Sequence, residues 1–205
     1  MSISLEPQGI LLVLSSPSGG GKSTICRALL QADPLFEYSV SVTSRTPRVD
    51  EVNGRDYTFV PESEFHQLIE AGAFYEWAKV HDHLYGTRRD VVDEKISRGK
   101  DVVLDLDVTG SLNLKKINEK AVTVFVLPPS LRVLEERLRH RNTDNDGEIR
   151  KRLENARNEI NFAQKYDYVV VNEDLNRTIE TIRRIVDAER HSSKHQVVRI
   201  TDDGF

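Results

Sequence analysis

The sequence predicts an α/β fold in which helices cover a mostly parallel sheet wound by right-handed crossovers. Three apolar runs, at residues 10–14, 101–107 and 121–127, have the near-continuous hydrophobicity of strands that are buried on both faces. Segments with helical spacing of apolar residues lie between the first two runs and after the third. The length of 205 residues suits one domain, here expected to carry one or two mobile inserts.

The first half of the chain is expected to add short strands to this core. Residues 38–43 alternate like a short strand, and the Asn53-Gly54 turn signal precedes a returning strand at residues 57–60. Pro61 opens a helix that is expected to end near Gly72. The elements expected next are a strand at residues 74–80, a hairpin or turn at 81–87, and a helix at 88–98 closed by Gly99.

The second half continues the alternation of helices and strands. Helices are expected after Pro128, from Glu148 to about Gln164 and from Leu175 to Ala188, with a last strand at residues 168–171. The tail is polar, with an apolar interruption at residues 197–200. The predicted units are a core in residues 9–37, 99–136 and 165–190, an insert in 38–90, a lid at about 137–158 and a tail in 191–205.

Residues 15–24 combine the end of a buried strand, a glycine-rich turn and the start of a helix, which is the context of a phosphate-binding loop. Consecutive glycines let successive backbone N–H groups point at one anion. Lys22 can reach the terminal phosphates, and the Ser23 hydroxyl is placed to bind Mg²⁺. A nucleoside triphosphate is therefore expected here, held by Ser16, Pro17, Ser18, Gly19, Gly20, Gly21, Lys22, Ser23 and Thr24. Ser16 stands where the strict pattern has glycine, and a small residue is expected to fit there.

Composition and charge exclude several classes of function. The formal net charge of −4 gives no general reason to expect nucleic-acid or membrane binding. Cys26 is the single cysteine, which excludes an internal disulfide and a cysteine-built metal site. The first nine residues lack the features of a signal peptide, and no apolar run approaches the length of a membrane span. A soluble, cytoplasmic protein is expected.

Two carboxylates end the strand predicted at residues 101–107. Asp105 is expected at the carboxyl end of the strand, where ligands bind in open α/β sheets, and it can hold Mg²⁺ through water beside Ser23. Asp107 is expected on the same face of that strand. A strand-end aspartate can also simply cap a turn, but the pair on one face favours a functional role.

Two groups of arginines are suited to phosphate binding. Arg45 and Arg48 flank Thr46-Pro47 in a loop, where both guanidinium groups could grip one phosphate. Arg137, Arg141 and Arg152 surround a polar loop that is suited to a lid. Arginines that close over a phosphoryl group in transfer stabilise its charge, and the closed lid excludes water.

Glu76 lies between two aromatic residues in a predicted strand, so its carboxylate needs partners from elsewhere. Guanine offers two adjacent N–H donors on its Watson–Crick edge, whereas adenine has an acceptor in the middle of that edge. His81 and His83 could suggest a metal, but no third ligand follows, and a solvated loop is the favoured interpretation.

These motifs together resemble those of guanylate kinases, a group of nucleoside-monophosphate kinases, over about residues 9–190. The phosphate loop alone is shared by many unrelated functions, whereas the set of further motifs is not. Those motifs are Ser-Arg-Thr-Pro-Arg at 44–48, Val-Asn-Gly-Arg-Asp-Tyr at 52–57, Tyr-Glu-Trp at 75–77, Tyr-Gly-Thr at 85–87, Leu-Asp-Leu-Asp at 104–107 and Val-Asn-Glu-Asp-Leu at 171–175.

The resemblance implies a P-loop NTPase-type core with a GMP-binding insert at residues 38–90, a lid, and the reaction ATP + GMP to ADP + GDP with Mg²⁺. It implies that the GMP phosphate is bound by Ser41, Arg45, Arg48, Tyr57 and Tyr85, and guanine by Glu76, Thr87 and Asp107, with Ser41 as a further candidate. It also implies lid arginines at Arg137, Arg141 and Arg152, and places Asn172 near the adenine of ATP. Besides Ser16, two positions depart from the family pattern: Thr87 stands where serine is also usual, and Asn142 where glycine is frequent.

Two other functions are compatible with parts of this pattern. Guanylate-kinase-like domains of scaffold proteins act as interaction surfaces, but the intact phosphate loop and lid arginines favour an enzyme. A kinase for another monophosphate or for a phosphorylated sugar is disfavoured by Glu76 together with Asp107. Both a monomer and a homo-oligomer are compatible with the sequence.

Overall fold

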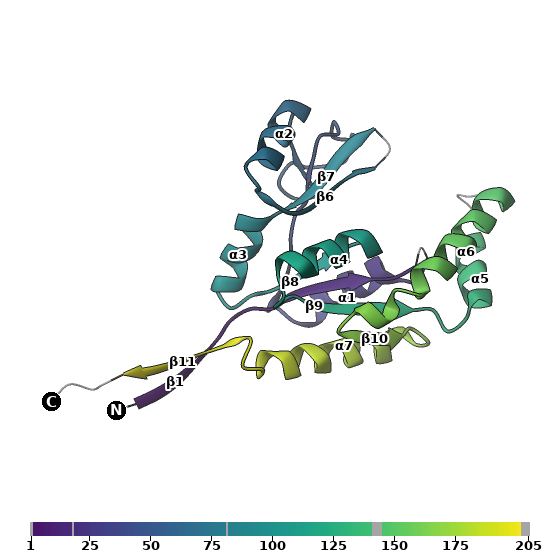
Figure 1. Ribbon diagram of the computed structural model, residues 1–205. Helices are drawn as coiled ribbons and strands as arrows, with labels where there is room; N and C mark the ends of the chain where they lie inside the picture. The colour runs from purple at the N-terminus through teal and green to yellow at the C-terminus, as the bar shows by residue number, and fades with distance from the viewer. Residues whose placement is uncertain (1, 18, 81, 141–144, 202–205) are drawn as a thin grey trace.

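The computed structural model describes residues 2–17, 19–80, 82–140 and 145–201, whose strands form three sheets (Figure 1). The central sheet is parallel throughout and has the order β10-β9-β2-β8-β3. The predicted α/β class with a parallel core is confirmed. The five strands are β2 (Leu11–Ser15), β3 (Phe36–Tyr38), β8 (Asp101–Asp105), β9 (Val122–Leu127) and β10 (Tyr168–Val171).

Helices pack on both faces of the central sheet because side chains alternate along its strands. Leu12 on β2 packs into the cluster that includes α1 and α7, whereas its neighbour Val13 packs with α3 and α4. Every residue of β2 is buried, which explains the uninterrupted apolar run in the sequence. The helix α4 was not predicted. The four helices are α1 (Lys22–Ala32), α3 (Arg89–Ser97), α4 (Val108–Ile117) and α7 (Leu175–Arg190).

A second sheet of four strands, ordered β5-β4-β7-β6, stands apart from the core and is covered by α2 (Figure 1). Phe65 of α2 is fully buried against Phe74, with ring centroids 4.6 Å apart. Phe65 and Phe74, together with Val42 and Leu84, form a hydrophobic core of this unit. Its elements are β4 (Val42–Thr43), β5 (Thr58–Phe59), α2 (Glu62–Glu70), β6 (Phe74–Val80) and β7 (His83–Arg88).

The single strand predicted at residues 38–43 is wrong. Tyr38 pairs with Val103 in the central sheet, whereas Val42 pairs with Gly86 in the second sheet. The chain crosses from one sheet to the other between β3 and β4, and side-chain alternation cannot reveal such a change of partner. The expected return strand β5 also runs parallel to β4 rather than antiparallel. The connection through residues 44–57 is long enough for a parallel crossover.

Two helices, α5 (Leu131–His140) and α6 (Asp146–Ile160), extend side by side from the carboxyl edge of the central sheet (Figure 1). They pack through Leu134, Leu138 and Ile149. A capping box starts α6, since Asn145 accepts from the Glu148 N–H and Glu148 accepts from the Asn145 N–H. This cap places the start of α6 earlier than predicted, and the helix ends before a short 3-10 turn, η1 (Ala163–Lys165).

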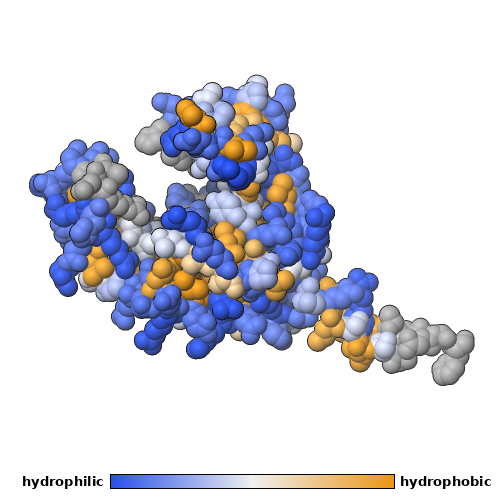
Figure 2. Space-filling model, turned by 180° about the vertical axis from the view of Figure 1, so that it is seen from behind, coloured by the Kyte–Doolittle hydropathy of each residue, from blue (hydrophilic) through white to orange (hydrophobic). Residues whose placement is uncertain are grey.

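The two ends of the described chain form a two-stranded antiparallel ribbon, β1 (Ser2–Pro7) with β11 (Gln196–Thr201). The ribbon projects from the body as an arm (Figures 1 and 2). Its cross-strand pairs Ile3–Ile200 and Leu5–Val198 leave an apolar stripe exposed. The sequence predicts only a polar tail here and not the ribbon, because the pairing joins segments from opposite ends of the chain.

Candidate active site

The glycine-rich loop joins β2 to α1 at the carboxyl edge of the central sheet. Gly21 caps α1 with a φ of +97° and Gly19 has a φ of +89°, so both adopt the left-handed backbone that glycine tolerates. No acidic side chain lies in the first turn of α1, and no side chain caps it. The N-terminus of α1 therefore keeps its backbone N–H groups and positive dipole end available for an anion. Ser16 is buried in the loop, as a small residue can be, and Ser18 lies outside the described residues.

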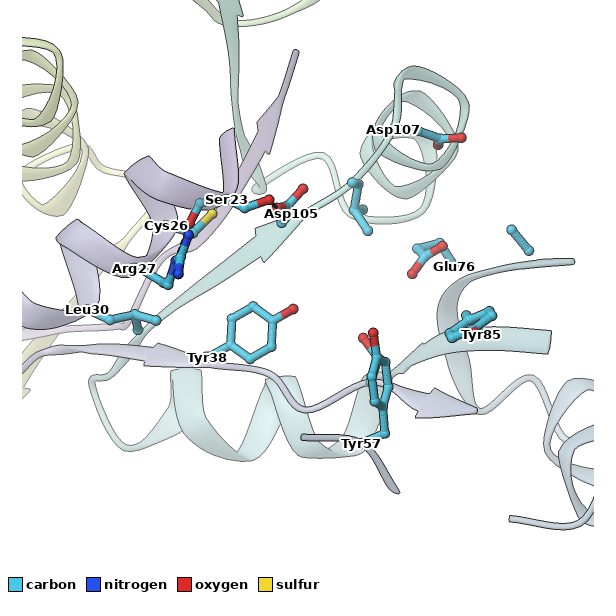
Figure 3. A pocket seen from close by; sticks show the side chains of 14 residues that line it. Ser23, Cys26, Arg27, Leu30, Tyr38, Tyr57, Glu76, Tyr85, Asp105 and Asp107 are labelled. Atoms are coloured by element: carbon cyan, nitrogen blue, oxygen red, sulfur yellow. Dashed lines mark hydrogen bonds between the residues drawn. The ribbon is translucent and has the colours of Figure 1, made fainter. Parts of the chain in front are cut away.

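Three side chains meet where β2 and β8 end side by side. The Lys22 ammonium lies 2.7 Å from Asp105 Oδ1 and donates to the Leu106 carbonyl at 2.8 Å. The Ser23 hydroxyl donates to Asp105 Oδ2 at 2.7 Å (Figure 3). The predicted pairing of Ser23 with Asp105 is therefore present in the structure. Residue Thr24 follows on α1 and is exposed.

Ser23 and Asp105 fit a magnesium site by the chemistry of their donors. Mg²⁺ prefers oxygen ligands and is usually bound through one or two protein groups together with phosphates and water. A hydroxyl and a carboxylate oxygen within 2.7 Å of each other meet that requirement at the mouth of the phosphate loop. Among the described residues, no group of three or more His, Cys, Asp and Glu could hold a metal by itself. His83 belongs to β7, and His81 lies outside the described residues.

The expected placement of Asp107 on the same strand face as Asp105 is wrong. β8 ends at Asp105, and Asp107 is the N-cap of α4, where its Oδ1 accepts from the Gly110 N–H at 2.7 Å. An aspartate at this position satisfies an otherwise unpaired N–H of the first helical turn. Asp107 still lines the same cavity as Asp105, although it does so from the N-terminus of α4 and not from β8.

A cavity of about 670 Å³ separates the end of the central sheet from the second sheet, and the surface is hollowed there (Figures 2 and 3). This volume suits a nucleotide-sized ligand. Ser23 and Asp105 lie on one side, and Tyr57, Glu76 and Tyr85 on the other (Figure 3). The expected site residues that line it are Ser23, Ser41, Tyr57, Glu76, Tyr85, Asp105 and Asp107.

Tyr38 and Arg27 also line this cavity and were not predicted. Tyr38 turns its hydroxyl toward the cavity (Figure 3). Although the residue is 41 % exposed overall, desolvation of the hydroxyl and then the nearby Asp105 carboxylate raise the pKa of Tyr38 to about 12. The protonated hydroxyl can donate a hydrogen bond. Its place at the end of a parallel strand was the signal that could have identified it. Cys26 is buried, and burial raises the pKa of its thiol to about 12, so the thiol stays protonated.

Glu76 is held by its neighbour on the paired strand. The buried Thr87 hydroxyl donates to Glu76 Oε1 at 2.8 Å. Burial raises the pKa of Glu76, the Thr87 hydrogen bond lowers it, and the nearby Asp107 carboxylate raises it further. A ligand that donates two hydrogen bonds would stabilise the ionised form of Glu76. Trp77, the next residue, is 47 % exposed.

Arg45 is engaged with a carboxylate outside the cavity. Its guanidinium makes a two-pronged contact with Glu51, at 2.9 and 2.8 Å, and donates to the Tyr85 hydroxyl at 3.3 Å. The Glu51 hydrogen bonds raise the pKa of Arg45, so it stays charged. Glu51 also accepts from the backbone N–H of Arg48. Arg45 also lies over the Tyr57 ring, so it contacts two of the predicted phosphate-binding residues that line the cavity, although Arg45 and Arg48 are not among its lining residues.

Two of the expected residues around ATP lie beside the phosphate loop. Arg137 of α5 donates through Nη2 to the Asn172 carbonyl at 3.2 Å. Asn172 is buried, and its Nδ2 donates to the Gly20 carbonyl at 3.1 Å. Arg152 lies on α6 and is half-buried, whereas Arg141 and Asn142 lie outside the described residues.

Comparison with known proteins gives a consistent result. The guanylate kinase family model matches residues 8–189. Guanylate kinases from Caldanaerobacter subterraneus and Paramagnetospirillum magneticum are 45 % and 47 % identical, covering 92 % and 93 % of this chain and 91 % and 89 % of their own lengths. The crystal structure of guanylate kinase from Anaplasma phagocytophilum has a TM-score of 0.73 at 35 % identity, covering 95 % of this chain and 93 % of that one. The resemblance inferred from the motifs is confirmed. In the described part of the chain, no helix combines the length and apolar character needed to cross a membrane.

Proposed function

The chain belongs to the guanylate kinase family, and we propose a role for each of its site residues in the guanylate kinase reaction. It is a nucleoside-monophosphate kinase that transfers the γ-phosphoryl group of ATP to GMP, giving ADP and GDP. We propose that ATP binds through the phosphate loop and that GMP binds in the cavity between the two sheets. Since both nucleotides are cytoplasmic metabolites, we propose the cytoplasm as the place of action.

The donor side is formed by the phosphate loop and the start of α1. The backbone N–H groups around Gly19 to Gly21 would surround the phosphates, and Lys22 would contact the terminal ones. Ser23 and Asp105 would hold Mg²⁺, which supplies neutralisation of the β- and γ-phosphate charge when bound. The ion pair of Lys22 with Asp105 already orients the ammonium toward this region.

The acceptor side is formed by the second sheet and the N-cap of α4. Glu76 would accept hydrogen bonds from both Watson–Crick N–H donors of guanine. Thr87 and Asp107 would fix the position of the Glu76 carboxylate and complete the recognition of guanine. Ser41, Tyr57 and Tyr85 line the same cavity and would contact the phosphate of GMP. Arg45 and Arg48 would join them, which requires Glu51 to release Arg45 or to turn with it.

The transfer itself needs alignment of two nucleotides and neutralisation of charge more than covalent chemistry. The GMP phosphate oxygen attacks the γ-phosphorus in line with the leaving oxygen of ADP. We propose that residues 137–158 act as the lid, with Arg137, Arg141 and Arg152 stabilising the charge of the moving group. Closure of the lid would exclude water, which otherwise competes as phosphoryl acceptor.

One observation carries this assignment: Glu76 and Asp107 face Ser23 and Asp105 across a single nucleotide-sized cavity. The test is ADP production from ATP and Mg²⁺ with GMP, AMP, CMP or UMP offered separately. Turnover with GMP well above that with the other three supports base recognition by Glu76. Comparable turnover with all four would contradict this assignment of the acceptor site.

A further inference from the structure

A buried side chain supports the phosphate loop from beneath. Asn172 follows the last residue of β10, is 5 % exposed, and reaches the loop across the end of the central sheet. Its Nδ2 donates to the carbonyl of Gly20 at 3.1 Å. This carbonyl belongs to the peptide that joins Gly20 to Gly21, in the middle of the glycine run. Asn172 therefore bonds directly to the backbone that would surround the phosphates.

Thr178 of α7 fixes which way the Asn172 amide points. The buried Thr178 hydroxyl lies 3.2 Å from Asn172 Oδ1 and donates to it. A reversed amide would place its oxygen against the Gly20 carbonyl, so that two acceptors would face each other. The Thr178 hydroxyl thus acts on the loop through Asn172, and within the described part of the loop it has no bond of its own.

The contact between Asn172 and the loop leaves no spare room. A Cβ atom placed on Gly21 would lie 2.7 Å from Asn172 Nδ2. The backbone of Asn172 also accepts from Arg137 Nη2 at 3.2 Å. The second terminal nitrogen, Nη1, is buried without a hydrogen-bond partner among the described residues and lies 4.0 Å from the same Cβ position. One residue thereby contacts both the loop and an arginine aimed at it.

We propose that Asn172 is a positioning residue for the phosphate end of ATP, with Thr178 as the residue that orients it. The inference rests on the proposed binding of ATP phosphates in the loop. Asn172 holds the Gly20–Gly21 peptide and Arg137 in a fixed relation, so that loop N–H groups and a guanidinium meet the phosphates together. The Asn172 amide forms hydrogen bonds with Gly20 and Thr178. This role differs from binding adenine through the same amide.

The distinguishing probe is inorganic tripolyphosphate, which has the phosphates of ATP without its base. Binding of tripolyphosphate and of ATP, both with Mg²⁺, is measured by calorimetry on the wild type, Asn172→Leu and Thr178→Val. Both substitutions keep the number and branching of the side-chain heavy atoms and remove hydrogen-bonding groups. We expect both ligands to bind about tenfold more weakly to each variant, since one buried hydrogen bond is lost or misdirected.

Controls separate positioning from loss of folded protein. GMP binding is measured on the same samples and should stay within about twofold, because its cavity does not include Asn172. Thr178→Ser retains the hydroxyl and should restore tripolyphosphate binding. Thr181→Val is the matched control, since the exposed Thr181 hydroxyl bonds only to the Arg177 carbonyl of the same helix.

Three results would overturn the inference. Weaker ATP binding with unchanged tripolyphosphate binding would assign Asn172 to adenine recognition. Unchanged binding of both ligands would remove it from the donor site. A wild type that phosphorylates GMP but does not bind tripolyphosphate would show that the loop does not recognise phosphates independently of the base. If the wild type does not phosphorylate GMP at all, the proposed function is contradicted instead.

Discussion

The Thr87 hydroxyl donates to Glu76 Oε1 at 2.8 Å, across a pair of residues that face each other on β6 and β7. The bond leaves Oε2 of Glu76 for another donor and fixes the carboxylate toward the cavity shared with Asp107. Register between two antiparallel strands thus sets the direction of a side chain that would recognise the base.

Replacing Glu76 with glutamine should impair GMP use selectively. The amide cannot offer two charged acceptors to guanine, so KM for GMP should rise by roughly 10- to 100-fold, as for loss of a hydrogen bond to a charged group. KM for ATP should change less than about twofold. Steady-state kinetics with each substrate varied in turn provide the measurement. Thr87→Ser retains the hydroxyl and serves as the control, and an equal loss for both nucleotides would argue against base recognition by Glu76.

The pH dependence of GMP binding should report the raised pKa of Glu76. The ionised carboxylate is the form that accepts from guanine, so affinity should fall as pH decreases through a pKa above the ordinary glutamate range. The free energy of unfolding should change with pH in the opposite direction to GMP affinity. The folded state binds the proton more tightly than the unfolded state, so stability is lost as pH rises through the same window.

Two titrations check these signs. The GMP phosphate titrates at about pH 6 in both proteins, so the test is the difference between them: between about pH 4.5 and 7.5, calorimetric GMP affinity should decline more steeply toward acid in the wild type than in Glu76→Gln. Thermal unfolding of the same proteins should show the variant gaining stability relative to the wild type as pH rises. Identical pH profiles for the two proteins would show that ionisation of Glu76 controls neither GMP affinity nor stability.

Lys22→Ala should abolish phosphoryl transfer while GMP still binds. The ammonium lies on the donor side, bonded to Asp105 and the Leu106 carbonyl, and is not part of the predicted base site. Loss of a charged group that stabilises the moving phosphoryl should lower kcat by roughly 10²–10³-fold or more. Single-turnover kinetics combined with GMP calorimetry test both halves of this prediction. Near-normal turnover would exclude the assigned role of Lys22.

Asp101 should matter for stability rather than for catalysis. This buried carboxylate accepts from the Ile10 N–H at 2.9 Å and from Arg190, and so links β8 to β2 and α7. Asp101→Asn should cost about 2–3 kcal/mol, less than for a fully buried pair because Arg190 retains Asp33. Urea unfolding measures the loss, and kcat should be unchanged at temperatures where the variant is folded. Glu180→Gln, which breaks an exposed ion pair with Arg184, should cost less than about 0.5 kcal/mol.

The sequence by itself determined the elements whose signal is local. The run at β2 is apolar because both faces of the sheet are covered, and this pattern needs no knowledge of which helix covers which face. The phosphate loop was also predictable from the sequence, since its glycines, Lys22 and Ser23 are contiguous. The pairing of Ser23 with Asp105 was also predictable because parallel strands end at the same edge.

Only the tertiary structure decided which partners distant residues find. The Asn172 amide bonds to Gly20 across 152 positions of sequence, and no local pattern encodes that contact. Arg45 contacts Glu51 as well as the cavity residue Tyr85, and Asp107 caps α4 instead of extending β8. Side-chain periodicity reports burial and local backbone shape, whereas these contacts depend on how separate elements come together in space.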